Sequence, residues 1–87
     1  MISRTTKQFW NLYNALPADV QKRADRAYEL WQNDPSHPGS QFKRVDPDEP
    51  IYSVRIGRDY RALGVLRDDI VTWFWIGKHE VYDRILR

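Results

Sequence analysis

Cysteine is absent from this chain of 87 residues, and histidine occurs only twice, as His37 and His79. The lack of cysteine excludes disulfide bonds, a thiol nucleophile and zinc sites that use cysteine. Two histidines in unrelated contexts do not suggest a histidine-rich metal site, and we expect no metal and no cofactor. The glycine-rich phosphate loop, the nucleophile elbow, the HExxH motif and the dinucleotide fingerprint are also missing, which excludes several common enzyme classes.

Long hydrophobic runs are missing as well. Residues 1–4 lead directly into polar sequence, without an apolar stretch long enough for a signal peptide or a membrane span, so we expect a cytoplasmic protein. The length predicts one domain, residues 1–87, with a modest core. Hydrophobic residues make up 41% and charged residues 30%, a balance typical of a folded protein. A net charge of +2 permits nucleic-acid binding without requiring it.

Two closely joined helices are predicted near the N-terminus. The first has apolar residues at the spacing i, i+3, i+4 and i+7, is capped by Thr5 or Thr6 and ends before Pro17. The second follows at once and carries an apolar stripe of its own. The tryptophans of these helices, Trp10 and Trp31, are expected to serve packing rather than function. The two stripes consist of Phe9, Leu12, Tyr13 and Leu16 in the first helix and of Val20, Ala24, Ala27 and Trp31 in the second.

Strands are predicted for most of the second half of the chain. Residues 33–40 contain two prolines and a glycine and are expected to form a loop without regular structure. Alternating or β-prone sequence then follows, with a hairpin turn at residues 67–69. The stretch 70–76 is apolar on both faces, which indicates a central strand. The predicted strands are residues 42–45, 51–56, 60–66 and 70–76.

The last segment predicts a short helix over residues 79–87, after Gly77 has ended the final strand. The order of elements indicates the α+β class: an N-terminal helical hairpin packed on an antiparallel sheet of three or four strands, followed by a short C-terminal helix. The helices are expected to cover one face of the sheet. The apolar side of the last helix is expected to consist of Val81, Tyr82, Ile85 and Leu86.

A group of basic, imidazole and phenol side chains is expected near one end of the sheet. Arg55 alternates to the face opposite its apolar neighbours, and Arg61 lies on the next strand. Lys78, His79 and Tyr82 come where the last strand meets the last helix. In an antiparallel meander these three places can converge on one face or rim of the sheet.

Such a group is suited to the cleavage of RNA by its own 2′-hydroxyl. That reaction needs a base for the hydroxyl, cations for the pentacovalent phosphate and an acid for the leaving 5′-oxygen. Guanidinium groups bind phosphate bidentately, and histidine titrates near neutral pH. The scheme requires no metal ion.

The sequence resembles the RelE/ParE toxins of type II toxin–antitoxin systems. The segment YSVRIGRDYRAL at residues 52–63 is similar to the family's Tyr-x-Val-Arg-x-Gly-Asp-Tyr-Arg core. The segment WIGKHEVY at residues 75–82 is similar to its closing strand-to-helix motif. The Leu-Pro pair at 16–17 and the Phe-Lys pair at 42–43 match as well, so the resemblance covers nearly the whole chain.

The resemblance implies a toxin of the RelE-like mRNA interferase branch, which cuts messenger RNA on the ribosome and inhibits translation. Its implied partners are a cognate antitoxin, mRNA and the ribosome, with a monomer when the protein is free. Arg55 and Arg61 would hold the scissile phosphate. His79 would act as general acid or base, and Tyr82 would orient or activate the 2′-hydroxyl. Further RNA or phosphate contacts would come from Lys43, Arg58 and Lys78.

Structural interpretations of the same residues remain open. Arg61 can pair with Asp59 or with an acid of the last helix, a surface contact worth about 0–1 kcal/mol. His79 can be an ordinary helix-start residue, and Tyr82 can belong to the core. Two other functions also remain open: inhibition of DNA gyrase, as in the ParE branch, and a non-toxic protein-binding module of the same fold.

Overall fold

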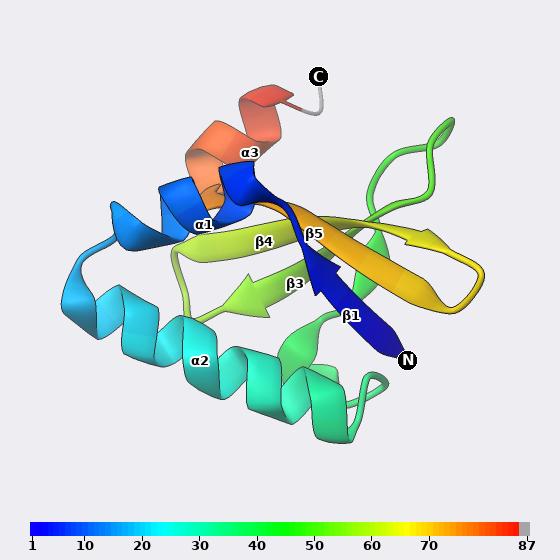
Figure 1. The fold of residues 1–87 in the computed structure, drawn as a ribbon, viewed down its shortest axis with the longest axis horizontal. Coiled ribbons are helices and arrows are strands. Elements are labelled where there is room, and N and C mark those ends of the chain that lie inside the picture. Colours follow the sequence, from blue (N-terminus) through cyan, green and yellow to red (C-terminus); the bar gives the residue numbers. More distant parts are fainter. Residues whose placement is uncertain (86–87) are drawn as a thin grey trace.

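The computed structural model describes residues 1–85. A five-stranded sheet forms its centre, with helices on both sides (Figure 1). The helices are α1 (Lys7–Asn14), α2 (Ala18–Asn33) and α3 (His79–Ile85), and a 3-10 helix covers Pro38–Ser40. The strands are β1 (Ile2–Thr5), β2 (Lys43–Arg44), β3 (Ile51–Ile56), β4 (Tyr60–Arg67) and β5 (Ile70–Lys78). The predicted α+β class is confirmed.

The prediction of three or four strands is wrong because it misses β1. The strand order is β1-β5-β4-β3-β2, and β1 runs parallel to β5, from Ile2 beside Ile70 to Thr5 beside Trp73. Local periodicity does not reveal β1, because it has only four residues and its partner lies near the other end of the chain. β1 also makes β5 an interior strand, as its two apolar faces predicted.

Hydrogen bonds from β1 and its end hold α1 against the sheet. The indole Nε1 of Trp73 donates to Ser3 Oγ at 3.1 Å, and the backbone N of Thr6 donates to Trp73 O at 3.0 Å. Thr6 also caps α1, since its Oγ1 accepts from Phe9 N at 3.1 Å. The first helix therefore starts at a point that β1 has already placed beside β5.

The helical hairpin forms as predicted, with Pro17 between the two helices. In α2, Val20 and Ala24 are buried and Trp31 is fully buried, which confirms its apolar stripe. Trp10 packs edge-on against Phe9 and Tyr13, with ring centroids 5.2 Å apart in both pairs, although it is 47% exposed, and its Nε1 donates to Thr5 Oγ1 at 2.8 Å. No helix within the described residues is long and apolar enough to cross a membrane.

A bulge in β5 gives both faces of the sheet a tryptophan. The β4–β5 register passes from Leu63 beside Trp75 to Gly64 beside Trp73, so Phe74 is an extra residue. The extra residue reverses the alternation, and Trp73 and Trp75 therefore belong to separate clusters on opposite faces.

Helices pack on both faces of the sheet, so the expectation that they cover only one face is wrong. Figure 1 shows α2 below the strands and α3 above them. The buried cluster on the α2 side consists of Ala24, Trp31, Val54, Ile56, Ala62, Val71, Trp73 and Ile76. The cluster on the α3 side consists of Leu63, Trp75 and Tyr82.

The last strand and last helix depart from the prediction in detail. β5 continues past Gly77 to Lys78, and α3 begins at the next residue without a loop. Tyr82 is buried, as the expected apolar side required, but Val81 is 40% exposed and does not belong to it. A helix of seven residues makes about two turns, so only a few of its side chains can face the sheet. The expectations for the Ile85 side chain and for Leu86 lie outside the described residues.

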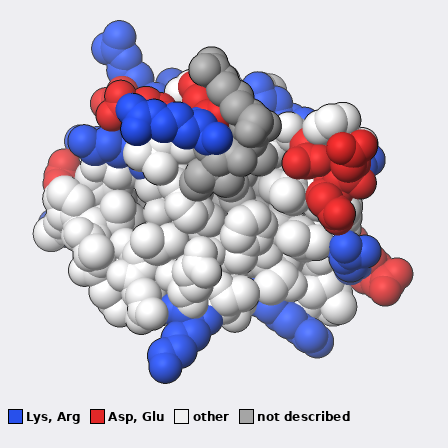
Figure 2. All heavy atoms as spheres, turned by 90° about the horizontal axis from the view of Figure 1, so that it is seen from above, with Lys and Arg blue, Asp and Glu red and all other residues white. Residues whose placement is uncertain are grey.

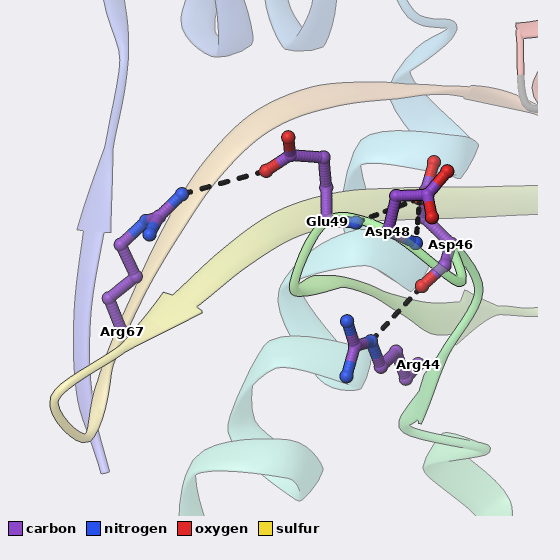
Figure 3. A network of polar contacts seen from close by, with 5 residues as sticks. All are labelled: Arg44, Asp46, Asp48, Glu49 and Arg67. Atoms are coloured by element: carbon purple, nitrogen blue, oxygen red, sulfur yellow. Dashed lines mark hydrogen bonds and ion pairs between the residues drawn. The ribbon is translucent and has the colours of Figure 1, made fainter.

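The loops before β2 and β3 contain local order, and the predicted loop at residues 33–40 contains more than expected. The 3-10 helix lies within residues 33–40, and α2 itself runs to Asn33. In the acidic loop before β3, Asp46 accepts hydrogen bonds from Asp48 N at 2.8 Å and Glu49 N at 2.9 Å. Arg44 Nε donates to Asp46 O at 3.0 Å, and Glu49 pairs with Arg67 at 3.6 Å (Figure 3). The carboxylates of Asp46 and Glu49, at this end of β3, are therefore engaged within their own loop and hairpin.

Candidate functional site

The site is built on the β3–β4 pair, at the end where β3 finishes. Arg55 and Arg61 are direct partners in the ladder, so both side chains project from the same face. This is the α3 side, because Leu63 lies two residues beyond Arg61 on the same strand. Each guanidinium also bonds to nearby backbone: Arg55 Nε donates to Gly57 O at 2.9 Å, and Arg61 Nη1 donates to Tyr60 O at 2.8 Å.

The Arg61 guanidinium lies where its positive charge is disfavoured. Burial lowers the pKa of Arg61, and the positive charge of Arg55 lowers it further. Tyr82, Asp83 and Asp59 act in the opposite direction. Among residues 1–85, neither arginine forms an ion pair with a carboxylate, so the pairing of Arg61 that was considered from the sequence does not occur there. A bound phosphate would supply the missing negative charge.

His79 and Tyr82 approach this arginine pair from α3. The backbone N of His79 donates to Asp59 O at 2.7 Å, which ties the start of α3 to the β3–β4 turn. The His79 and Tyr82 rings lie 5.2 Å apart between centroids. Tyr82 is only 8% exposed and packs in the cluster that contains Leu63, two residues beyond Arg61 on β4. The start of α3 therefore lies at the same end of the sheet as the two arginines and on the same face, and Tyr82 serves the core as well.

Asp83 lies beside His79 and was not among the predicted site residues. Its Oδ2 lies 3.4 Å from His79 Nδ1, with the two side chains 43% and 45% exposed. The available signal was the spacing of four residues, which brings two side chains together on one face of a helix. An acid at that spacing from a candidate catalytic histidine marks a group that can orient the imidazole.

The three residues expected to add phosphate contacts are distributed differently. Lys43 is exposed on β2 beside Ser53, and this pairing puts it on the face of Arg55. Arg58 is exposed in the β3–β4 turn. Lys78 pairs with Tyr60, which packs against the α2-side cluster, so it lies at the same end of the sheet but on the opposite face. Lys43 and Arg58 can extend the site, and Lys78 is not gathered into it.

Metal ligands do not gather in the described part of the chain. Within residues 1–85, no three histidine or acidic side chains are close enough to hold a metal ion. The groups that do gather are two guanidiniums, an imidazole, a phenol and a carboxylate. Together they can bind an anion and move a proton.

Comparison with known protein families shows to which family the chain belongs. The family described as the ParE-like toxin domain matches residues 18–84, which include both arginines, His79 and Tyr82. The chain belongs to the ParE-like toxin domain family. The match confirms the RelE/ParE resemblance on the segment that holds most of the sheet and α3. No curated protein matches the sequence.

Solved structures of toxins share the fold of this ParE-like domain. The toxin–antitoxin complex RelB–RelE of Methanococcus jannaschii matches with a TM-score of 0.73 and 20% identity, over 93% of this chain and 96% of the other. YafQ of E. coli matches with a TM-score of 0.72 and 10% identity, over 92% and 94%. RelBE2 of Mycobacterium tuberculosis, another toxin–antitoxin complex, matches with a TM-score of 0.70 and 18% identity, over 90% of this chain and 96% of the other. At these identities the likeness is one of fold.

Proposed function

We propose that this ParE-like protein is the toxin of a toxin–antitoxin module that cuts messenger RNA on the ribosome and so inhibits translation. The observation that carries the proposal is the Arg55–Arg61 pair, which has no carboxylate ion-pair partner within residues 1–85 and lies on the face of the sheet that α3 covers, the helix that carries His79 and Tyr82. Two adjacent guanidiniums on a partly buried face repel each other, and an anion between them relieves that repulsion.

The proposed chemistry is an in-line transfer within the RNA. The 2′-oxygen forms a bond to phosphorus, the bond from phosphorus to the 5′-oxygen breaks, and a 2′,3′-cyclic phosphate remains. Arg55 and Arg61 bind the phosphate oxygens as charge develops on them. His79 acts as general acid or base, and Tyr82 orients or activates the 2′-hydroxyl. Lys43 and Arg58 lie where they can contact neighbouring phosphates.

Mapping message ends in a cell-free translation reaction tests the proposal. The wild type is expected to cut at defined codon positions, and Arg61→Ala to lower the cleavage rate by about 10²–10³-fold, as loss of a transition-state donor does. His79→Ala is expected to lower it by about 10²–10⁴-fold. The matched control is Arg67→Ala on the same strand, because Arg67 pairs with Glu49 at the other end of β4. If the folded wild-type protein leaves the message intact, the proposal is overturned.

Inhibition of DNA gyrase is the second candidate, since the matching family is described by its ParE-like members. A supercoiling assay with purified gyrase separates the two functions. The presence of both His79 and Tyr82 beside the arginines favours cleavage, because a stoichiometric inhibitor needs no proton-transfer pair. Absence of both activities, with unhindered growth of cells that express the protein, would indicate a non-toxic binding module.

A cognate antitoxin is the partner that we infer for this toxin. Two of the similar structures are antitoxin–toxin complexes. Figure 2, viewed from the α3 side, shows a broad area without charged side chains. An open groove on the α3 side of the sheet continues the face that holds Arg55 and Arg61, with Val65, Thr72 and Phe74 along its floor. Its lining also includes the charged residues Arg4, Arg67 and Asp68. An antitoxin segment with apolar and acidic residues would fit along it. High-level production of the protein alone without toxicity would contradict this inference.

A further inference from the structure

The two histidines of the chain have opposite kinds of partner at Nδ1. His37 Nδ1 accepts a hydrogen bond from Gly39 N at 2.9 Å, so a neutral His37 carries its proton on Nε2. His79 Nδ1 instead faces the carboxylate of Asp83, with Oδ2 at 3.4 Å. A carboxylate accepts and does not donate, so a neutral His79 carries its proton on Nδ1 and keeps a lone pair on Nε2.

We propose that Asp83 is a positioning residue that holds His79 in the Nδ1–H tautomer, so that Nε2 is the base that accepts the proton of the 2′-hydroxyl. The inference rests on the proposed RNA cleavage and narrows the role of His79 from acid or base to base. It follows the general rule that the polar partner at one imidazole nitrogen decides the chemistry of the other, with Asp83 Oδ2 at 3.4 Å from Nδ1 as that partner.

The helix dipole does not explain the position of Asp83. α3 has only seven residues, with His79 at its first position and Asp83 within its last turn. Acids stabilise the beginning of a helix and cations its end, so Glu80 and Arg84 are favourably placed in α3 and Asp83 is not. An acid at a place that the dipole disfavours is consistent with a role toward His79.

The position of Asp83 also connects the imidazole to the arginines. The Asp83 carboxylate is close enough to Arg61 to act on its guanidinium, while it contacts His79 directly. Asp59 fixes the other side of His79 through the 2.7 Å bond from His79 N to Asp59 O. The imidazole is therefore held through its backbone by the β3–β4 turn and through its ring by α3, beside the arginine pair.

The proton and the bonds balance with His79 as base. The 2′-hydroxyl gives its proton to His79 Nε2 as the 2′-oxygen forms its bond to phosphorus. The bond from phosphorus to the 5′-oxygen breaks, and the 5′-oxygen takes a proton from a water molecule. The resulting hydroxide removes the proton from Nε2, and the imidazole returns to the Nδ1–H tautomer.

Long-range ¹H–¹⁵N spectra of the purified protein test the tautomer without any activity assay. At about pH 8.5 an ordinary imidazole is neutral. The wild type is expected to show His79 protonated on Nδ1 and His37 protonated on Nε2, as an internal reference. Asp83→Ala is expected to move His79 toward Nε2–H and to leave His37 unchanged. Glu80→Ala, which removes the acid next to His79 in sequence, is the matched control and is expected to change neither ring.

The outcomes separate this inference from the proposed function. An Nε2–H tautomer of His79 in the wild type, or a spectrum unchanged in Asp83→Ala, would overturn the role of Asp83. If the message-end assay shows cleavage, Asp83→Ala is expected to lower its rate by roughly 10–100-fold, less than removal of the general base itself. If the tautomer behaves as expected but no RNA is cut, the positioning by Asp83 holds and the cleavage function fails.

Discussion

Arg55 and Arg61 lie directly opposite each other on neighbouring strands, two positive charges on one face of the sheet. Like charges in this arrangement destabilise a sheet by about 0.2–1 kcal/mol relative to neutral pairs. Burial lowers the pKa of Arg61, and the positive charge of Arg55 lowers it further, as expected for two like charges that repel each other. The fold therefore keeps a locally unfavourable pair at the place where we propose that phosphate binds.

Arg55→Thr is expected to stabilise the protein by about 0.2–1 kcal/mol, because it removes the repulsion and places a β-branched residue in a strand. Urea unfolding at low ionic strength measures the gain, which is expected to shrink at high salt as the charges are screened. Arg67→Thr is the control, since Arg67 faces Glu49 and its removal relieves nothing. A loss of stability in Arg55→Thr would contradict the repulsion.

Ser3→Ala is expected to destabilise the fold by about 1–3 kcal/mol, because it leaves the Nε1 of the buried Trp73 without its acceptor. Equilibrium urea unfolding measures the change. Thr5→Ala removes an equivalent acceptor from Trp10, whose indole is exposed and can bond to water. Equal losses of stability in Ser3→Ala and Thr5→Ala would show that the hydrogen bond between Trp73 Nε1 and Ser3 Oγ is not protected from water.

Gly64→Ala is expected to destabilise the protein by about 1–3 kcal/mol through overpacking. A Cβ at this position would lie 2.7 Å from Val71 Cγ1 and 2.8 Å from the Trp73 ring, on strand neighbours that have no free space. Thermal unfolding measures the loss. Gly39→Ala, where the nearest atom is the His37 ring at 3.1 Å on an exposed turn, is expected to cost less. A neutral Gly64→Ala would mean that the bulge relaxes easily.

Asp46 is expected to make stability depend on pH in the acid range. Hydrogen bonds from the backbone N of Glu49 and then of Asp48 lower the pKa of its carboxyl below the ordinary 3.8. A lowered folded-state pKa contributes stability above 3.8, and this contribution is lost as the pH falls from 3.8 through the folded value. Asp46→Ala is thus expected to be less stable than wild type near neutral pH, with the difference disappearing in acid. Unfolding curves of both proteins across pH measure it.

The helices and the antiparallel hairpins could be predicted because their signals are local. Periods of 3.6 and 2 residues show which side of a segment is apolar, and the cap at Thr6 and the break at Pro17 are read within a few residues. The turn at Asp68 and Asp69, where both residues have positive φ, closes a hairpin between adjacent strands. Arg55 and Arg61 were predicted to be near each other for the same reason.

The sequence by itself determined the α+β class, the helical hairpin, the meander and the facing arginines. The tertiary structure decided the parallel β1 next to β5, the bulge at Phe74, the placing of α3 on the second face and the contact between Asp83 and His79. These features depend on partners that are distant in sequence or on the exact register of a strand, and one residue of register exchanges the two faces of a sheet. Local patterns carry no information about such choices, because the free energy that fixes them comes from packing between elements.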